Sequence, residues 1–290
     1  FLPATKSVPK EIMPLVDRPL VQYAIDEARA AGIKEFIFVT SRGKSALEDY
    51  FDSAPELVQA LVDGKKTALL ELLKQTDMPS GSVAYIRQQE RRGLGHAVWC
   101  ARNLIGDEPF AVILGDEIID ASVPGLAQLI HIYKQRKGAV LGVQEVPQQE
   151  VSRYGIISAR KVRSGLHRVD DLVEKPAPAD APSNLAVIGR YVLPPEIFPI
   201  LRKTPPGKNG EIQLTDALRQ LVKNTPMFAH EVEGQRHDAG DKLGFLIATV
   251  ELALKNPSLG PAFGDFLQQR LRPATADARR RGPGRGRATT

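Results

Sequence analysis

Charged side chains near the start of the chain could bind phosphate. Lys6 and Lys10 lie four residues apart in a segment that also contains Pro3, Pro9 and Pro14. Because three prolines in so short a span disfavour a continuous helix, we expect a rigid loop here. A fixed lysine ammonium can neutralise the negative charge that develops on a transferring phosphoryl group. Ordinary surface lysines in a solvated loop are the alternative.

Two aspartates suit a divalent cation. Asp116 follows the apolar run 110–114, and Asp238 precedes a predicted helix. In open α/β sheets, ligands bind beyond the carboxyl ends of the strands, which is where Asp116 is expected. Mg²⁺ typically takes one or two carboxylates and completes its coordination with water and substrate phosphates. Asp116 is therefore predicted as a metal ligand, with Asp238 as a possible second one. Capping of a turn or helix is the alternative for both.

The segment QQERRGLGH, from Gln88 to His96, follows a predicted strand and opens a predicted helix. Gly93 and Gly95 would allow a ligand to approach the backbone closely, and a helix N-terminus favours anions. The Gln88 amide has a donor beside an acceptor, which matches the N3–H and O4 edge of uracil. A Gly-x-Gly pattern alone is a weak signal, so a plain strand-to-helix turn stays open. His96 is interpreted as a packing or capping residue.

The pair Glu174–Lys175 ends a predicted strand directly before Pro176. Adjacent residues on a strand point to opposite faces. The turn that begins at Pro176 could nevertheless bring the carboxylate and the ammonium group into one pocket.

These residues must be positioned by an alternation of strands and helices. The first half alternates apolar runs with helical patterns, which predicts a parallel sheet with helices on both faces. The pattern changes near residue 154, where strands follow one another and predict antiparallel additions. The predicted helices are 19–31, 45–51, 57–73 with an interruption at Gly64, 95–103, 126–136, 196–202, 212–223, 242–256 and 259–271, and the predicted strands are 35–40, 82–87, 110–114, 139–146, 155–158, 166–174 and 185–193.

Composition excludes several classes of protein. The formal net charge of the 290 residues is +5, but the tail 273–290 holds five arginines and one aspartate. The rest has 34 basic and 33 acidic residues, so the charge favours no nucleic-acid-binding fold. No apolar run is long enough for a membrane span, which would need about 18 residues. Cys100 is the single cysteine, which fits a reducing cytoplasm. We expect one domain over 1–272 and a disordered tail over 273–290.

These motifs, in this order, resemble the bacterial UTP–glucose-1-phosphate uridylyltransferases, also called UDP-glucose pyrophosphorylases. The resemblance covers the chain to about Leu271, and it is carried by FLPATKSVPKEIMPLVDRPLVQYAIDEA, IRQQERRGLGHAVWCA, VILGDE, RYGIIS, LVEKPAPADAPSNLAVIGRYVL, GEIQLTDAL and HDAGDKLGF. It implies a three-layer, Rossmann-like nucleotidyltransferase fold with a mixed, mainly parallel central sheet. It also implies UTP and glucose 1-phosphate as substrates, UDP-glucose and pyrophosphate as products, and Mg²⁺ as cofactor.

The resemblance assigns a role to each candidate residue. Lys10 and Lys175 are expected to contact phosphate and, with Asp116, to be catalytic. The other expected roles are uracil recognition by Gln88 and Gly93, metal binding by Asp116 and Asp238, and sugar-phosphate binding by Gly155, Glu174, Lys175 and Gly189.

The resemblance also implies features outside the site. The family pattern begins with a strand and a Gly-x-Gly-Thr-Arg loop before the position of Phe1, so we expect roughly 15–20 further residues in the natural protein. A cytoplasmic homo-oligomer, a dimer or tetramer, is expected, with no nucleic-acid or membrane partner. Two alternatives stay open at this point: a sister enzyme that uses dTTP or another sugar 1-phosphate, and a non-catalytic homologue that binds nucleotide sugars.

Overall fold

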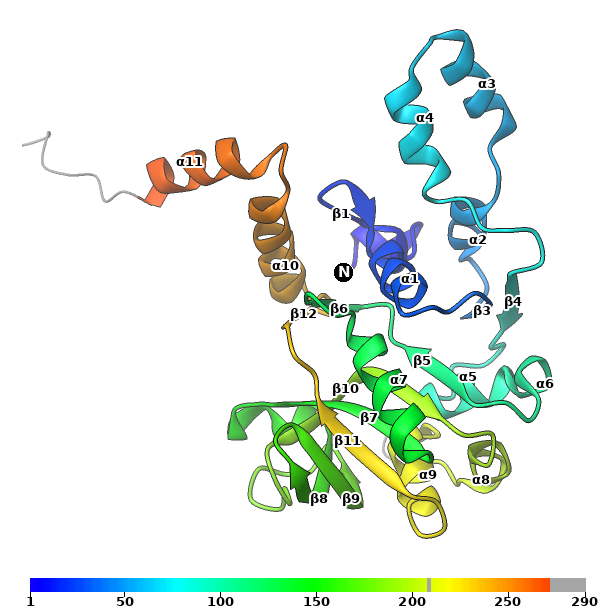
Figure 1. Ribbon diagram of the computed structural model, residues 1–290, viewed down its shortest axis with the longest axis vertical. Helices are drawn as coiled ribbons and strands as arrows, with labels where there is room; N and C mark the ends of the chain where they lie inside the picture. The colour runs from blue at the N-terminus through cyan, green and yellow to red at the C-terminus, as the bar shows by residue number, and fades with distance from the viewer. Residues whose placement is uncertain (208–209, 272–290) are drawn as a thin grey trace, which may run out of the picture.

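The computed structural model describes residues 1–207 and 210–271, so the predicted tail 273–290 lies outside the described residues. A six-stranded sheet forms its centre (Figure 1). The strands, in spatial order, are β5 (Phe110–Ile113), β10 (Leu185–Leu193), β7 (Ala139–Glu145), β11 (Met227–Glu231), β9 (Leu166–Glu174) and β8 (Gly155–Arg163).

The sheet is mixed, as predicted, but its hydrogen-bonded neighbours are mostly antiparallel. Within the six strands only β7 and β11 pair in parallel. Strands β5, β7, β11 and β8 nevertheless share one direction, because β10 and β9 run against them between their neighbours. The expected mainly parallel sheet is therefore correct for strand direction and wrong for neighbour pairing. The insertion of β10 between β5 and β7, and of β9 between β11 and β8, causes the difference.

Three smaller strand pairs complete the fold of the described residues. The parallel pair consists of β3 (Phe36–Thr40) and β4 (Val83–Arg87). The pair β6 (Glu117–Asp120) and β12 (Gln235–Asp238) is antiparallel, as is the short hairpin β1 (Pro14–Leu15) and β2 (Arg18–Pro19). The sequence analysis did not predict β1, β2, β6, β11 or β12.

Helices cover both faces of the six-stranded sheet, which confirms the three layers. Alternate residues of each strand face opposite layers. Val140 and Ile188 pack on one side with Leu129 of α7 (Gly125–Arg136). Leu141 and Val143 pack on the other side with α8 (Ile197–Lys203) and α9 (Leu214–Leu221). The core side chains of β7 are buried on both faces, as a central strand requires.

The remaining helices lie around this sheet. They are α1 (Leu20–Ala30), α2 (Ser45–Phe51), α3 (Pro55–Asp63), α4 (Thr67–Lys74), α5 (Leu94–Cys100), α6 (Arg102–Ile105), α10 (Lys242–Lys255) and α11 (Gly260–Leu271), with 3-10 turns at Ala4–Lys6, Lys10–Ile12 and Gln148–Arg153. In Figure 1, α3 and α4 form a projecting hairpin, and α10 and α11 form an arm on the other side. Among the described helices, none is both long and apolar enough to cross a membrane.

Two predicted helices are divided in the structure. The helix predicted over 57–73 separates into α3 and α4 at the predicted interruption, because α3 ends at the C-cap Gly64 and the following Lys65 adopts a positive φ of 51°. The helix predicted over 95–103 separates into α5 and α6 at Ala101. The opening loop contains only short 3-10 turns, as its prolines predict.

Strands β3 and β5 are less buried than expected. Their nearly all-apolar composition is typical of strands buried on both faces, yet most of their residues are half-buried. Each has a strand neighbour on one side only within the described part of the chain, β4 for β3 and β10 for β5. Apolar composition alone could not reveal how many neighbours each strand has.

Candidate functional site

The opening loop places Lys10 against the predicted metal ligand. Lys10 lies at the start of a 3-10 turn, and its Nζ is 2.6 Å from Oδ2 of Asp116. Both side chains are about one-third exposed, at 34% and 31%, so solvent and a substrate can reach the pair. The loop thus brings the predicted phosphate-binding ammonium beside the predicted metal carboxylate, although the two residues are 106 positions apart.

Asp116 and Asp238 come together because β6 pairs with β12. Asp238 lies opposite Glu117 in this pair, and the Ala239 N–H donates to the Asp116 carbonyl at 2.9 Å. A Cβ added to Gly240 would lie 2.8 Å from Oδ1 of Asp238 and 3.5 Å from Oδ2 of Asp116. The two carboxylates therefore approach the same backbone position, Gly240.

This donor set fits Mg²⁺. No group of three or more acidic, histidine or cysteine ligands gathers in the part of the chain described here. Mg²⁺ does not need such a group, since one or two carboxylates with substrate phosphates and water complete its shell. Each carboxylate is paired with a basic side chain in this structure. Lys10 contacts Asp116, and Nη2 of Arg153 is 3.4 Å from Oδ2 of Asp238. Arg153 was not among the predicted residues.

Gln88 lies at the end of β4 and closes the turn before α5. Its Nε2 donates to the Gly93 carbonyl at 3.0 Å and lies 3.0 Å from Nδ1 of His96. Burial, followed by the charge of Arg92, lowers the pKa of His96, which favours the neutral ring that can accept this bond. The structure thus adds His96 as a residue that orients Gln88, beyond the packing or capping role predicted.

Gly93 is required by both conformation and space. It precedes α5 with φ of 91°, a region that favours glycine. An added Cβ would lie 2.8 Å from the carbonyl oxygen of Ile212. The Gly95 N–H donates to that same carbonyl at 2.9 Å, and the Ile212 N–H donates to the backbone carbonyl of Arg92 at 2.8 Å. The segment around Ile212 therefore fixes the predicted nucleotide loop.

The turn after β9 brings Glu174 and Lys175 together, as predicted. Lys175 adopts a positive φ of 47°, and its Nζ is 3.5 Å from Oε1 of Glu174. Thr215 donates a 2.6 Å hydrogen bond to the other carboxylate oxygen. Gly155 pairs with Glu174 across β8 and β9, and a Cβ there would lie 2.8 Å from the Thr215 hydroxyl. A carboxylate, an ammonium group and a backbone position without a side chain thus lie close together.

Gly189 makes its close approach to the protein itself. A Cβ at this position would lie 2.7 Å from Cβ of Leu114, two residues before Asp116. Its N–H donates to Oε2 of Glu117 at 3.2 Å. Gly189 therefore packs β10 against the segment between β5 and β6 that carries Asp116, and its predicted sugar contact stays a prediction.

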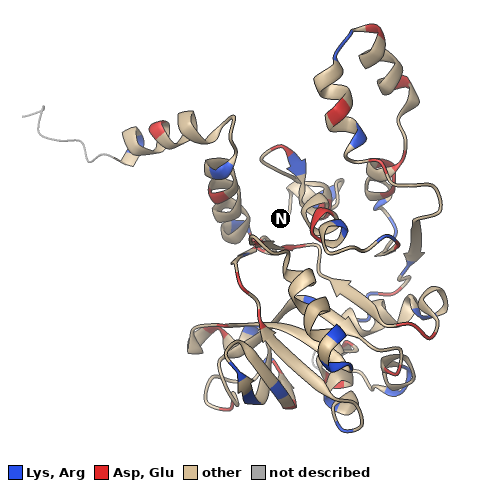
Figure 2. Ribbon diagram, in the orientation of Figure 1, with Lys and Arg blue, Asp and Glu red and all other residues tan. Residues whose placement is uncertain are grey.

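A buried network of charges lies behind the carboxylates, and sequence patterns did not reveal it. Arg190 is fully buried and binds both carboxylate oxygens of Glu27, at 2.9 and 2.7 Å. Arg236 binds Oε2 of Glu117 at 2.7 Å. No local motif marks these partners, because Glu27 and Arg190 are 163 positions apart. Elsewhere the charges are interspersed over the molecule (Figure 2).

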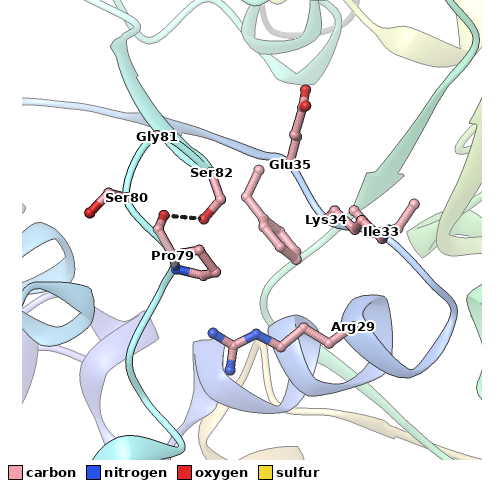
Figure 3. Close-up of a pocket in the computed structure, with 9 residues that line it drawn as sticks. Arg29, Ile33, Lys34, Glu35, Pro79, Ser80, Gly81 and Ser82 are labelled. Atoms are coloured by element: carbon pink, nitrogen blue, oxygen red, sulfur yellow. Dashed lines mark hydrogen bonds between the residues drawn. The ribbon is translucent and has the colours of Figure 1, made fainter.

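The pocket drawn in Figure 3 is separate from these residues. It has a volume of about 470 Å³ and lies where β3 and β4 begin, opposite to the ends that carry Thr40 and Gln88. Arg29, Lys34 and Glu35 line it together with the turn 79–82. The Ser82 hydroxyl donates to the Pro79 carbonyl at 2.7 Å, which closes the turn internally. None of the predicted site residues lines this pocket.

The arrangement defines a class of enzyme. The site suits the transfer of a nucleotidyl group between two anionic substrates. It contains paired carboxylates beside a lysine, a glycine-lined turn before a helix, and a second lysine beside a glutamate. The sequence matches the nucleotidyl transferase family over residues 1–253. The chain belongs to that family.

Within the nucleotidyl transferase family, this chain is similar to UTP–glucose-1-phosphate uridylyltransferases. The chain is 49% identical over 268 residues to the UTP–glucose-1-phosphate uridylyltransferase of Bacillus subtilis, a match that covers 92% of this chain and 91% of the relative. It is 46% identical over 270 residues to UTP–glucose-1-phosphate uridylyltransferase 2 of Staphylococcus saprophyticus, covering 93% of each chain. The resemblance predicted from the sequence is confirmed.

Solved structures agree with these matches. A UDP-glucose pyrophosphorylase solved with UDP-glucose aligns at a TM-score of 0.79 and 42% identity, covering 88% of this chain and 94% of that one. The UTP-bound enzyme of Acinetobacter baumannii aligns at 0.86 and 40% identity, covering 93% and 94%. The fold class predicted from the sequence is confirmed.

Proposed function

We propose that this chain transfers a uridylyl group from UTP to α-D-glucose 1-phosphate, giving UDP-glucose and pyrophosphate. The observation that carries the proposal is the meeting of Lys10, Asp116 and Asp238 in a chain closely related to enzymes of that name. A phosphate oxygen of glucose 1-phosphate attacks the α-phosphorus of UTP. The bond from that phosphorus to the bridging oxygen breaks, and pyrophosphate leaves with the electron pair.

The chain's own residues position and neutralise the reacting phosphates. Lys10 stabilises negative charge on the departing phosphate, and Lys175 holds the attacking one. Neither substrate forms a covalent bond to the protein, so no activated nucleophile is required. Lys10 must exchange its 2.6 Å contact with Asp116 for a phosphate oxygen, which a one-third-exposed side chain is free to do.

Asp116 and Asp238 are proposed to hold Mg²⁺, which supplies charge neutralisation and orientation of the phosphates when bound. Their oxygens approach Gly240. Without the metal, Lys10 balances the charge of Asp116 and Arg153 balances that of Asp238.

Gln88 and the backbone at Gly93 are proposed to bind uracil. Because Nε2 of Gln88 is already bonded to Gly93 and His96, its oxygen is the atom left to accept the uracil N3–H. That contact does not separate uracil from thymine, so the choice depends on space near C5 and on the ribose 2′-hydroxyl.

Glu174 and Gly155 are proposed to bind the glucose ring. The Thr215 bond at 2.6 Å fixes one oxygen of Glu174 and leaves capacity to accept from sugar hydroxyls. Gly155 is proposed to let the ring approach the backbone beside Thr215, whose hydroxyl would lie 2.8 Å from an added Cβ. Gly189 is proposed to act at the same end of the site through its packing on Leu114.

A homo-oligomer, a dimer or tetramer, is part of the proposal. Exposed apolar side chains on the α10–α11 arm support it, among them Leu243, Leu246 and Phe266. Light scattering of wild type and of Leu246→Glu measures the association state directly. A cytoplasmic location is proposed from the single thiol, Cys100, which needs no oxidising compartment.

Turnover with UTP and glucose 1-phosphate tests the main proposal, with pyrophosphate release as the readout. Asp116→Asn should lose most of the rate, whereas Asp63→Asn on the distant α3 should keep it. Gln88→Ala should mainly lose base preference in a competition between UTP and dTTP. Absence of turnover in the wild-type natural protein, with UDP-glucose binding intact by calorimetry, would refute the enzymatic proposal.

A further inference from the structure

We infer that Arg236 is a positioning residue that joins the metal-binding carboxylates to the sugar-phosphate turn. The inference rests on the proposed function, because it concerns the same site. No sequence motif and no comparison assigns a role to Arg236. Its guanidinium lies between the two groups of residues that the reaction must hold at a fixed separation.

The first set of contacts reaches the carboxylates. Nε of Arg236 donates to Oε2 of Glu117 at 2.7 Å, and Glu117 follows Asp116 directly. Nη2 of Arg236 lies 3.5 Å from Oδ2 of Asp238 and has no hydrogen-bond partner among the described residues. Arg236 therefore positions Asp116 indirectly, through its bond to the adjacent Glu117, and attracts Asp238 directly by its charge.

The second set of contacts reaches the sugar-phosphate turn. Nη1 of Arg236 donates to the Tyr154 hydroxyl at 3.3 Å, and the guanidinium lies 5.0 Å from the centre of the Tyr154 ring. The carbonyl of the same tyrosine accepts the N–H of Lys175 at 2.9 Å. One side chain thus links Asp116 and Asp238 to the backbone that carries Gly155 and Lys175.

Burial makes this link rigid. The side chains of Arg236 and Glu117 are 9% and 11% exposed, so solvent weakly screens their attraction. The guanidinium is charged, because arginine is not deprotonated in proteins.

A buried ion pair is a poor source of stability, because desolvation can cancel its attraction. The value of this pair lies instead in fixing geometry. The planar guanidinium has donors in set directions, so it can hold Glu117 and Tyr154 at once, whereas a lysine ammonium is a flexible point charge.

The test compares Arg236→Met, Arg236→Lys and Tyr154→Phe with wild type. Arg160→Met is the matched control, since Arg160 makes a two-bond pair with Asp170 on an exposed strand. Thermal unfolding first establishes that each variant is folded. The readouts are Mn²⁺ binding measured calorimetrically without substrates, and the KM for glucose 1-phosphate.

We expect Arg236→Met to weaken Mn²⁺ binding about tenfold or more, as loss of a partner behind metal ligands does. It should also raise the KM for glucose 1-phosphate. Arg236→Lys should show both effects to a smaller degree, and Tyr154→Phe should change only the KM. Arg160→Met should change neither.

Wild-type Mn²⁺ affinity and KM in folded Arg236→Met would overturn the inference. If that variant does not fold, unchanged values in Arg236→Lys would overturn it equally. Failure of the proposed function is distinguishable, since it would appear as no turnover in wild type, while Mn²⁺ binding still reports on Arg236.

Discussion

Replacing Arg190 with methionine should be the most destabilising single change behind the site. Arg190 lies in the middle of β10 with no exposed surface. It binds both oxygens of Glu27, and it donates to the carbonyls of Leu114, Gly189 and Glu117 at 3.4, 3.0 and 2.8 Å. Methionine keeps much of the volume and removes every one of these donors.

The expected loss follows from what Glu27 would face. Its side chain is 7% exposed, so the variant would leave a buried carboxylate without a countercharge. Breaking a buried pair in this way typically costs about 3–5 kcal/mol. That is a large part of the roughly 5–15 kcal/mol by which native domains are stable. The double variant Glu27→Gln/Arg190→Met should recover part of the loss, because no unpaired charge remains.

Urea unfolding followed by circular dichroism measures the free energy of unfolding of each variant. Arg160→Met removes an exposed pair and should cost no more than about 1 kcal/mol. A loss below about 1 kcal/mol for Arg190→Met would refute the reasoning. So would a double variant that is less stable than the single one, since that would show that the unpaired charge is not the cause.

Further predictions concern the site itself. Thr215→Val removes the 2.6 Å bond to Glu174 and should raise the KM for glucose 1-phosphate about tenfold, as loss of a bond to a charged group does; an unchanged KM would contradict it. Gly93→Ala forces a Cβ into 2.8 Å contact at a φ of 91° and should raise the KM for UTP while sparing that for glucose 1-phosphate. The folded pKa of His96 lies below its ordinary value of 6.5, so its contribution to stability is complete above that value. This contribution of His96 is lost as the pH falls through its folded pKa, because the protonated ring can no longer accept a hydrogen bond from Gln88. The KM for UTP, measured from pH 8 to 5, should therefore rise on acidification. A KM that does not change with pH would contradict this prediction.

Local patterns predicted most of the fold. The helix α1 and the strand β7 follow directly from apolar periodicity, and β8, β9 and β10 were recognised as successive strands. The strands that were missed are short, such as β6 and β12 with four residues each. Charged residues begin or end both of them, and their partners lie more than a hundred positions away, so no window of sequence contains the reason for their pairing.

The site residues were likewise only partly predictable from local sequence. Lys10, Asp116 and Lys175 could be identified because each lies in a recognisable sequence motif. The residues that hold them, Arg190 and Arg236, could not, since an arginine in a strand usually indicates a solvated face. Only the three-dimensional arrangement shows that both are paired, Arg190 with no exposed surface and Arg236 with 9% of its side chain exposed.

The pairing of β6 with β12 has a consequence for the order of events during synthesis. Asp116 emerges from the ribosome long before Asp238, and the strand that aligns them is completed only at residue 238. Contacts between such distant positions form late, because the intervening chain must first be ordered. A nascent chain halted before residue 227 therefore contains Lys10, Asp116 and Lys175 but lacks both the strand that lies between β7 and β9 and the second carboxylate, so activity reports on the synthesis of residues 227–238.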